Sequence, residues 1–304
     1  MRGPMDSSNR ERLKGIFAPI ATPFADDEAL DTQALEYNMA LYRETPLRGY
    51  LALGSNGENK SLNEEERQAV VDAVLEGKGD EQIVIAGVMY EAQRCAEQSL
   101  GWLASRGVDY ALVQSPSYFR KQLTDDCLVR YFSTLADHAR IPVLLYNSPG
   151  FNGMTLSFEL IQRLSEHPNI VGMKDSTPGC DLKIMDLDRD DFCVMVGSIG
   201  KLRGFVERGS IGGTVSLADY SPNPAVRLHE ALIGGWMPDA ESLNQKLNEA
   251  NHRIAGQFGV PGVKAAMNLL GFRGGIPRRP LYPLDAGQIV SIRTALIEAG
   301  VLEP

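Results

Sequence analysis

The stretch "NIVGMKDST", residues Asn169 to Thr177, is a short apolar run with a lysine set inside it. A run of this length and character is typical of a buried strand. Together with seven similar runs it makes eight along the first three quarters of the chain. The others are "GIFAPIA" from Gly15, "GYLALG" from Gly49, "QIVIAGV" from Gln82, "YALVQS" from Tyr110, "PVLLYN" from Pro142, "CVMVGS" from Cys193 and "GGTVSLA" from Gly212.

The segments between these runs have the periodicity of amphipathic helices. Examples are Leu62–Leu75, Ala92–Ser105, Asp125–Ala139 and Phe158–Leu164. Consecutive runs begin about 19 to 34 residues apart, the length of one strand–helix unit. Eight units with nearly continuous apolar strands predict an α/β protein with a (β/α)₈ TIM barrel. A doubly wound open sheet is the alternative, but no G-x-G-x-x-G motif follows the first run.

The pattern changes near Pro238, after which no strand-like run occurs. Three segments there have helical character: "DAESLNQKLNEANHRIAGQF", "PGVKAAMNLLG" and "DAGQIVSIRTALIEAG". We therefore expect residues 1–237 to form the barrel, with 1–12 as a flexible N-terminal segment. Residues 238–304 should form a C-terminal three-helix extension packed on it. The stretch Arg278–Pro280 is expected to be a loop or a subunit contact.

The composition excludes several classes of partner. The 304 residues are 43% hydrophobic and carry a formal net charge of −9, which disfavours nucleic acid. No apolar run is long enough to span a membrane, and the N-terminus lacks the apolar core of a secretory signal. Scattered cysteines indicate a reduced, cytoplasmic protein. The scattered histidines and the incomplete calcium-loop pattern "DLDRDD" favour no metal site.

Lys174 is the main candidate for chemistry. Alternation along the strand places Ile170, Gly172, Lys174 and Ser176 on one face, with Val171, Met173 and Asp175 on the other. If the second set lies under helices, Lys174 points into the barrel at the C-terminal end of its strand, where barrel enzymes act. A desolvated lysine can form a Schiff base with a carbonyl. The alternative is a lysine that extends out of the barrel mouth into water.

Two further features lie at the ends of other strands. Tyr146 closes the preceding apolar run, and a tyrosine hydroxyl near an imine can move protons. Its alternative is a core tyrosine with a satisfied hydroxyl. The turn "GSNGENKS" from Gly54 offers Ser55, Asn56 and backbone N–H groups that suit a carboxylate or phosphate. It misses the P-loop pattern at Asn59, so we do not expect nucleotide binding; a plain strand-to-helix turn is the other possibility.

In this order, these motifs resemble the dihydrodipicolinate synthase/N-acetylneuraminate lyase family of pyruvate-dependent class I aldolases. The resemblance runs over nearly the whole chain. Its pieces are "APIATPF" (Ala18–Phe24), "GSNGE" (Gly54–Glu58), "SPSYFRK" (Ser115–Lys121), "YNSPG" (Tyr146–Gly150), "GMKDS" (Gly172–Ser176) and Gly197 with Ser198 and Gly200.

The resemblance implies a role for each matching residue. Lys174 would form an imine with pyruvate or another 2-oxo acid, and no cofactor or metal would be required. Tyr146 would move protons, and Ser55 would link it to Tyr118, which would enter the site from a neighbouring subunit of a homodimer or homotetramer. The substrate-binding residues would be Ser55, Asn56, Ser176, Gly197, Val215 and Phe151. Glu58 and Asp175 are expected either to support the residues that contact the substrate or to serve only as turn and cap residues.

Phe151 bears on the substrate. Synthases of this family usually carry an arginine at its place, which binds the carboxylate of the aldehyde partner, and phenylalanine cannot do so. The C-terminal half looks most like 4-hydroxy-2-oxoglutarate aldolases. We therefore expect cleavage of a 4-hydroxy-2-oxo acid, 4-hydroxy-2-oxoglutarate or a 2-keto-3-deoxy sugar acid, to pyruvate and an aldehyde. The alternatives are a dihydrodipicolinate synthase and a non-catalytic 2-oxo-acid-binding protein.

Overall fold

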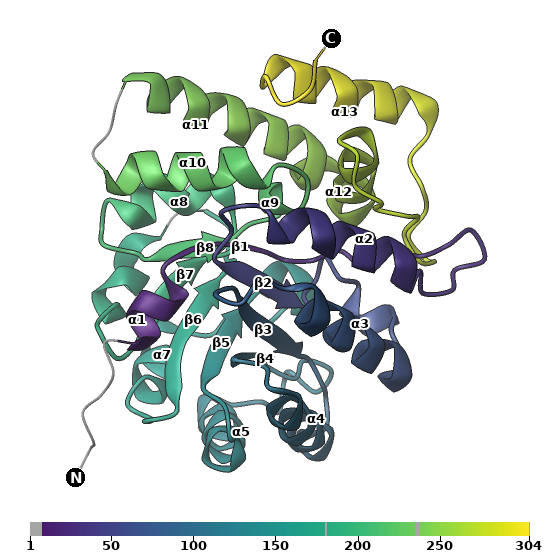
Figure 1. The fold of residues 1–304 in the computed structure, drawn as a ribbon. Coiled ribbons are helices and arrows are strands. Elements are labelled where there is room, and N and C mark those ends of the chain that lie inside the picture. Colours follow the sequence, from purple (N-terminus) through teal and green to yellow (C-terminus); the bar gives the residue numbers. More distant parts are fainter. Residues whose placement is uncertain (1–7, 180, 235–237, 304) are drawn as a thin grey trace.

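The computed structural model describes residues 8–179, 181–234 and 238–303. Eight parallel strands close into a barrel in the order of the sequence, from β1 to β8 (Figure 1). They are β1 (Gly15–Ala18), β2 (Gly49–Ala52), β3 (Ile83–Val88), β4 (Tyr110–Gln114), β5 (Val143–Asn147), β6 (Ile170–Asp175), β7 (Cys193–Val196) and β8 (Gly212–Thr214). Each strand lies within one of the eight apolar runs, so the predicted TIM barrel is confirmed.

Helices surround the barrel and connect its strands (Figure 1). The longer ones are α2 (Thr32–Arg43), α3 (Glu64–Gly77), α4 (Gln93–Arg106), α5 (Asp125–His138), α7 (Phe158–Leu164), α8 (Ile199–Val206) and α10 (Pro222–Ile233). Short turns are η1 (Asn59–Ser61), α6 (Pro149–Asn152), η2 (Leu182–Leu187) and α9 (Leu217–Tyr220). Side chains cap the N-termini of several of these helices. Asn63, for example, forms a capping box with Glu66 at the start of α3.

A short helix, α1 (Ser8–Leu13), precedes the first strand. Leu13 is fully buried in the apolar cluster inside the barrel. Asn9 accepts a hydrogen bond from the Tyr110 hydroxyl of β4 at 2.8 Å. Most of α1 comes from the segment for which we expected flexibility, and residues 1–7 of that segment lie outside the described residues.

The C-terminal part is helical, as the sequence predicts (Figure 1). α11 (Pro238–Asn251) runs through a π-helical turn, η3 (His252–Gly256), into α12 (Gln257–Leu269), and α13 (Ala286–Glu298) follows. Gly259, the third residue of α12, has φ 59° and ψ −141°, so the chain bends just after α12 begins. α11 packs on α10, and α12 packs on α9 beside the barrel mouth. Residues 235–237, at the expected boundary, lie outside the described residues.

The register of β6 departs from simple alternation. Val143 pairs with Ile170 but Leu144 pairs with Gly172, so β6 carries an extra residue, Val171. Val171 therefore joins the cluster inside the barrel while Ile170 lies in the outer layer, and the predicted faces of these two residues were wrong. Alternation resumes after the bulge, with Met173 in the outer layer.

A glycine is needed next to this bulge. A Cβ atom on Gly172 would lie 2.4 Å from the carbonyl oxygen of Cys193 on β7, so the close approach of the two strands requires glycine there.

Among the described residues, no helix combines the length and the apolar character that crossing a bilayer requires.

Candidate functional site at the barrel mouth

Lys174 and Tyr146 lie side by side at the C-terminal ends of β6 and β5. The two residues are direct partners in the parallel register. The Lys174 ammonium nitrogen lies 4.9 Å from the centroid of the Tyr146 ring. Both side chains are buried, Lys174 being 6% exposed and Tyr146 2% exposed. The structure therefore encloses Lys174 instead of letting it extend into water.

Ser55 reaches the same point from the loop that follows β2. Its hydroxyl oxygen lies 3.2 Å from the Tyr146 hydroxyl oxygen, within hydrogen-bond distance. Leu53 and Glu58, at the two ends of the loop, have positive φ values of 56° and 50°. Leu53 and Glu58, and not the loop glycines Gly54 and Gly57, therefore adopt the left-handed backbone conformation in this turn. Gly57 allows the loop that follows β1 to come close, because a Cβ atom on Gly57 would lie 3.0 Å from the Ile20 carbonyl oxygen.

Asn56 is fixed by an aspartate that the sequence analysis missed. Its amide nitrogen donates to the Asp219 carboxylate at 2.7 Å, and its amide oxygen lies 3.5 Å from the Ser216 hydroxyl. Asp219 lies in α9, directly after β8, and is fully buried. Burial raises the pKa of Asp219 to about 7, although the Asn56 hydrogen bond and the Lys174 charge lower it. One feature of the sequence could have identified Asp219: it is an acidic residue among the apolar residues that follow the last strand.

Three more predicted residues lie at the ends of neighbouring strands. Ser176 follows β6, Gly197 follows β7 and Val215 follows β8. A Cβ on Gly197 would lie 1.8 Å from the Ser176 hydroxyl oxygen, so glycine leaves the space that this hydroxyl occupies. Val215 is fully buried. All three positions are at the barrel mouth.

Tyr118 and Phe151 are not brought into this cluster within one chain. Tyr118 is 80% exposed and packs edge-on against Phe119, with ring centroids 5.0 Å apart. Phe151 is 65% exposed on α6. A cation lies near the α6 segment, since a Cβ on Gly153 would be 2.5 Å from a guanidinium nitrogen of Arg120.

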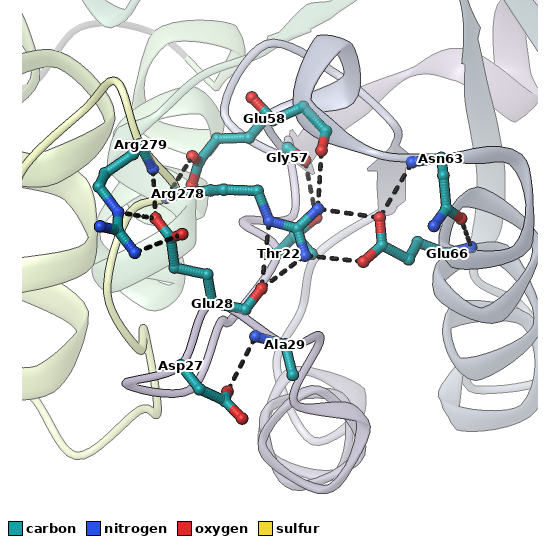
Figure 2. A network of polar contacts seen from close by, with 11 residues as sticks. Thr22, Asp27, Glu28, Ala29, Gly57, Glu58, Asn63, Glu66, Arg278 and Arg279 are labelled. Atoms are coloured by element: carbon teal, nitrogen blue, oxygen red, sulfur yellow. Dashed lines mark hydrogen bonds and ion pairs between the residues drawn. The ribbon is translucent and has the colours of Figure 1, made fainter.

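A network of polar contacts links Glu58, at the end of the loop that carries Ser55, to Arg278 (Figure 2). Glu58 forms a buried ion pair with Lys264 of α12, with 2.5 Å between Oε1 and Nζ. Its other carboxylate oxygen accepts from the Arg278 backbone N–H at 2.9 Å. The Arg278 guanidinium in turn donates to Glu66, to the Ser61 carbonyl and to the Glu28 carbonyl, so the expected loop at 278–280 is an intrachain contact. The C-terminal extension therefore fixes the loop that carries Ser55.

Asp175 is paired on the outer side of β6. Its carboxylate accepts from the Lys201 ammonium group of α8 at 2.7 Å, and both side chains are buried. Asp175 also contacts Asn147 and Thr177. The described residues include no group of three or more His, Cys, Asp or Glu side chains placed to hold a metal ion.

The chain is similar to known proteins over nearly its whole length. The sequence model of the dihydrodipicolinate synthetase family matches residues 12–299. A 4-hydroxy-tetrahydrodipicolinate synthase of Methanosphaerula palustris is 32% identical, over 93% of this chain and 98% of that protein. A probable mitochondrial 4-hydroxy-2-oxoglutarate aldolase of Emericella nidulans is 29% identical, over 97% of this chain and 98% of that protein.

A solved structure extends the likeness to the fold. The chloride-inhibited dihydrodipicolinate synthase of Acinetobacter baumannii, in complex with pyruvate, superposes with a TM-score of 0.89 at 26% identity. The match covers 95% of this chain and all of that one. Proteins named as synthases and as an aldolase are thus found at similar identity, and identity alone does not separate the two activities.

Proposed function

This chain belongs to the dihydrodipicolinate synthetase family, and on that premise we propose that Lys174 forms an imine with the ketone carbon of a 2-oxo acid. Enzymes of this family are class I aldolases and lyases, which use a lysine Schiff base with pyruvate and no cofactor. The observation that carries the assignment is the enclosure of Lys174 beside Tyr146, with Ser55 at 3.2 Å from the tyrosine hydroxyl. A lysine enclosed in this way is held next to its proton carrier, where its amine can attack a carbonyl.

The proposed reaction is the cleavage of a 4-hydroxy-2-oxo acid. The Lys174 amine adds to the ketone carbon, and loss of water leaves a protonated imine. Removal of the C4 hydroxyl proton lets the C3–C4 bond break, and its electron pair enters the imine to give an enamine while the aldehyde leaves. Protonation at C3 and addition of water then release pyruvate and the free amine. Tyr146 gives its hydroxyl proton to the departing water, takes the C4 hydroxyl proton as the phenolate that results, and returns that proton to C3, with Ser55 orienting its hydroxyl.

The remaining residues are assigned to binding. Ser55 and Asn56 hold the substrate carboxylate, and Ser176, Gly197 and Val215 line the pocket around C3. Tyr118 is exposed in one chain, which fits a role in a neighbouring subunit of a homo-oligomer. Phe151 stands where a carboxylate-binding arginine would serve a synthase, which favours an aldolase acting on 4-hydroxy-2-oxoglutarate or a 2-keto-3-deoxy sugar acid.

A synthase remains the second candidate because of Arg120. Its guanidinium lies against Gly153, in the segment that carries Phe151. A guanidinium there is able to pair with the carboxylate of aspartate semialdehyde and replace the missing arginine.

Two measurements test the proposal. Borohydride reduction in the presence of pyruvate should add one reduced adduct to the peptide that carries Lys174. Lys174→Ala should abolish the adduct, while the matched variant of an exposed lysine, Lys183→Ala, should keep it. An unmodified Lys174 peptide in the wild type would exclude both the aldolase and the synthase and favour a non-catalytic binding protein.

Substrate choice is decided by kcat/KM on one preparation. Pyruvate release from the 4-hydroxy-2-oxo acids should outpace condensation with aspartate semialdehyde. If aspartate semialdehyde is the better substrate, and Arg120→Ala but not the neighbouring Lys121→Ala removes the preference, the chain is a synthase with a substitute cation.

A further inference from the structure

Asp219 is a buried acid for which the proposed reaction has no assigned role. We propose that the site takes up a proton at Asp219 when it binds the carboxylate of a 2-oxo acid, so that the neutral form of Asp219 is the form that accepts substrate. The inference rests on the proposed function, because Asn56 is there assigned to the substrate carboxylate. It goes beyond that function by coupling the affinity for substrate to one ionisable group.

The two carboxylate oxygens of Asp219 have different surroundings. Asp219 is fully buried, and its Oδ2 atom accepts the amide hydrogen of Asn56 at 2.7 Å. Its Oδ1 atom is also buried and has no hydrogen-bond partner among the described residues. A buried oxygen without a partner is costly when it carries charge but is a natural position for a proton. Asp219 can therefore exist either as the charged carboxylate or as the neutral acid.

Substrate binding brings a second carboxylate close to Asp219. A substrate carboxylate held by Asn56 would be separated from Asp219 by one amide group. Two carboxylates that share a site cannot both be ionised without a large penalty, and one of them takes up a proton. Since a 2-oxo acid is fully ionised near neutral pH, Asp219 is the partner that responds.

The groups that face Asp219 leave it free to titrate. Lys174 on β6 is the one cation among the described residues whose charge acts on the pKa of Asp219, and it lowers it. Tyr42 on α2 donates its hydroxyl to the Asp219 backbone carbonyl and not to its carboxylate. Burial and the Asp219 charge raise the pKa of both Tyr42 and Tyr220, which keeps these two phenols neutral. β1, α10 and α12 also pack on α9, and no charged side chain of these elements, among the described residues, shifts the pKa of Asp219.

Because burial raises the pKa of Asp219 to about 7, the coupling falls in an accessible range. Free Asp219 loses its proton as the pH rises through about 7, and the proton must then be recovered on binding. The Kd for the acid should therefore rise above this pH, by at most about tenfold per pH unit for one proton. Any proton change at Lys174 on imine formation occurs equally in a variant that lacks the Asp219 carboxylate, so the difference between wild type and variant reports on Asp219.

The test is calorimetric titration of pyruvate into the full-length protein at about pH 7.5, in two buffers of different ionisation enthalpy. The difference in heat gives the protons taken up per pyruvate bound. The wild type should take up a measurable fraction of one proton more than Asp219→Asn, in which the amide retains an acceptor for Asn56. The exposed variant Asp126→Asn should match the wild type. Equal uptake in wild type and Asp219→Asn would overturn the inference.

Two further measurements remove ambiguity. Borohydride trapping on the same samples separates this inference from the proposed function: an adduct at Lys174 together with equal proton uptake rejects only the role of Asp219. A wild type that neither binds pyruvate nor forms the adduct rejects both. If Asp219→Asn does not fold, the wild type decides alone, because a Kd that stays constant from about pH 6 to about pH 8.5 excludes a titrating group in this range.

Discussion

Replacing Lys264 with methionine should destabilise the protein strongly, although Lys264 touches no residue of the proposed reaction. Its side chain is 1% exposed, and its ammonium group contacts Glu58 at 2.5 Å and the Ile276 carbonyl at 2.7 Å. The variant leaves the Glu58 carboxylate buried with the Arg278 backbone N–H as its remaining donor (Figure 2). An uncompensated buried charge of this kind costs about 3–5 kcal/mol.

The same ion pair predicts a partial rescue. Burial lowers the pKa of Lys264 to about 8, although Glu58 raises it. For Lys264, desolvation thus outweighs the attraction to Glu58. Removing both charges in Glu58→Gln with Lys264→Met should therefore recover more than half of the loss, because neither ion remains to be buried.

The pKa of Lys264 also sets the sign of a pH effect. The unfolded chain binds this proton up to about pH 10, while the folded chain releases it above about pH 8. The unfolded state therefore holds more protons between these values, and the free energy of unfolding should rise with pH there in the wild type. Lys264→Met should lack this rise.

Thermal unfolding followed by circular dichroism measures all three effects. A loss of about 3–5 kcal/mol corresponds to a fall in Tm of roughly 5–8 °C in a protein of this size. The control is Lys246→Met, an exposed lysine of α11, which should melt like the wild type. Since Glu58 ends the loop that carries Ser55, KM for the substrate should also rise in Lys264→Met. A melting temperature equal to that of the control, or a double variant less stable than the single one, would refute the reasoning.

Other predictions concern the barrel mouth. Tyr146→Phe should fold normally but turn over substrate roughly 10²–10⁴-fold more slowly, because the substitution removes one positioned proton carrier. Imine trapping at Lys174 should be slower but retained. Near-wild-type turnover would make Tyr146 a core residue only. Ser55→Ala should slow turnover less and add little to Tyr146→Phe in a double variant, because both act on one proton path; additive losses would separate their roles. The folded protein holds a proton on Asp219 up to about pH 7, which the unfolded chain releases near pH 4. The stability from this group is therefore complete below about pH 4 and lost as the pH rises through about 7, and Tm of the wild type should fall relative to Asp219→Asn over this range; parallel Tm curves would contradict it.

Much of the fold can be predicted from the sequence because its signals are local. The eight apolar runs and the helical periodicity between them are properties of neighbouring residues, and they determine the (β/α)₈ order directly. The position of Lys174 follows from the same local signal, since it stands at the C-terminal end of its run. The prediction failed within β6 at Val171, because a bulge is set by how the strand pairs with β5 and not by its own composition.

The polar partners around the site could not be predicted in this way. Asn56 and Asp219 are 163 positions apart and meet only because β2 and β8 end at the same mouth of the barrel. Glu58 and Lys264 form an ion pair only because α12 folds back beside the barrel. A single acid or lysine carries no sequence mark of its partner, and whether its charge is compensated depends on burial and distance. Local sequence therefore determined the barrel and its lysine, whereas tertiary structure alone decided which charges meet at its mouth.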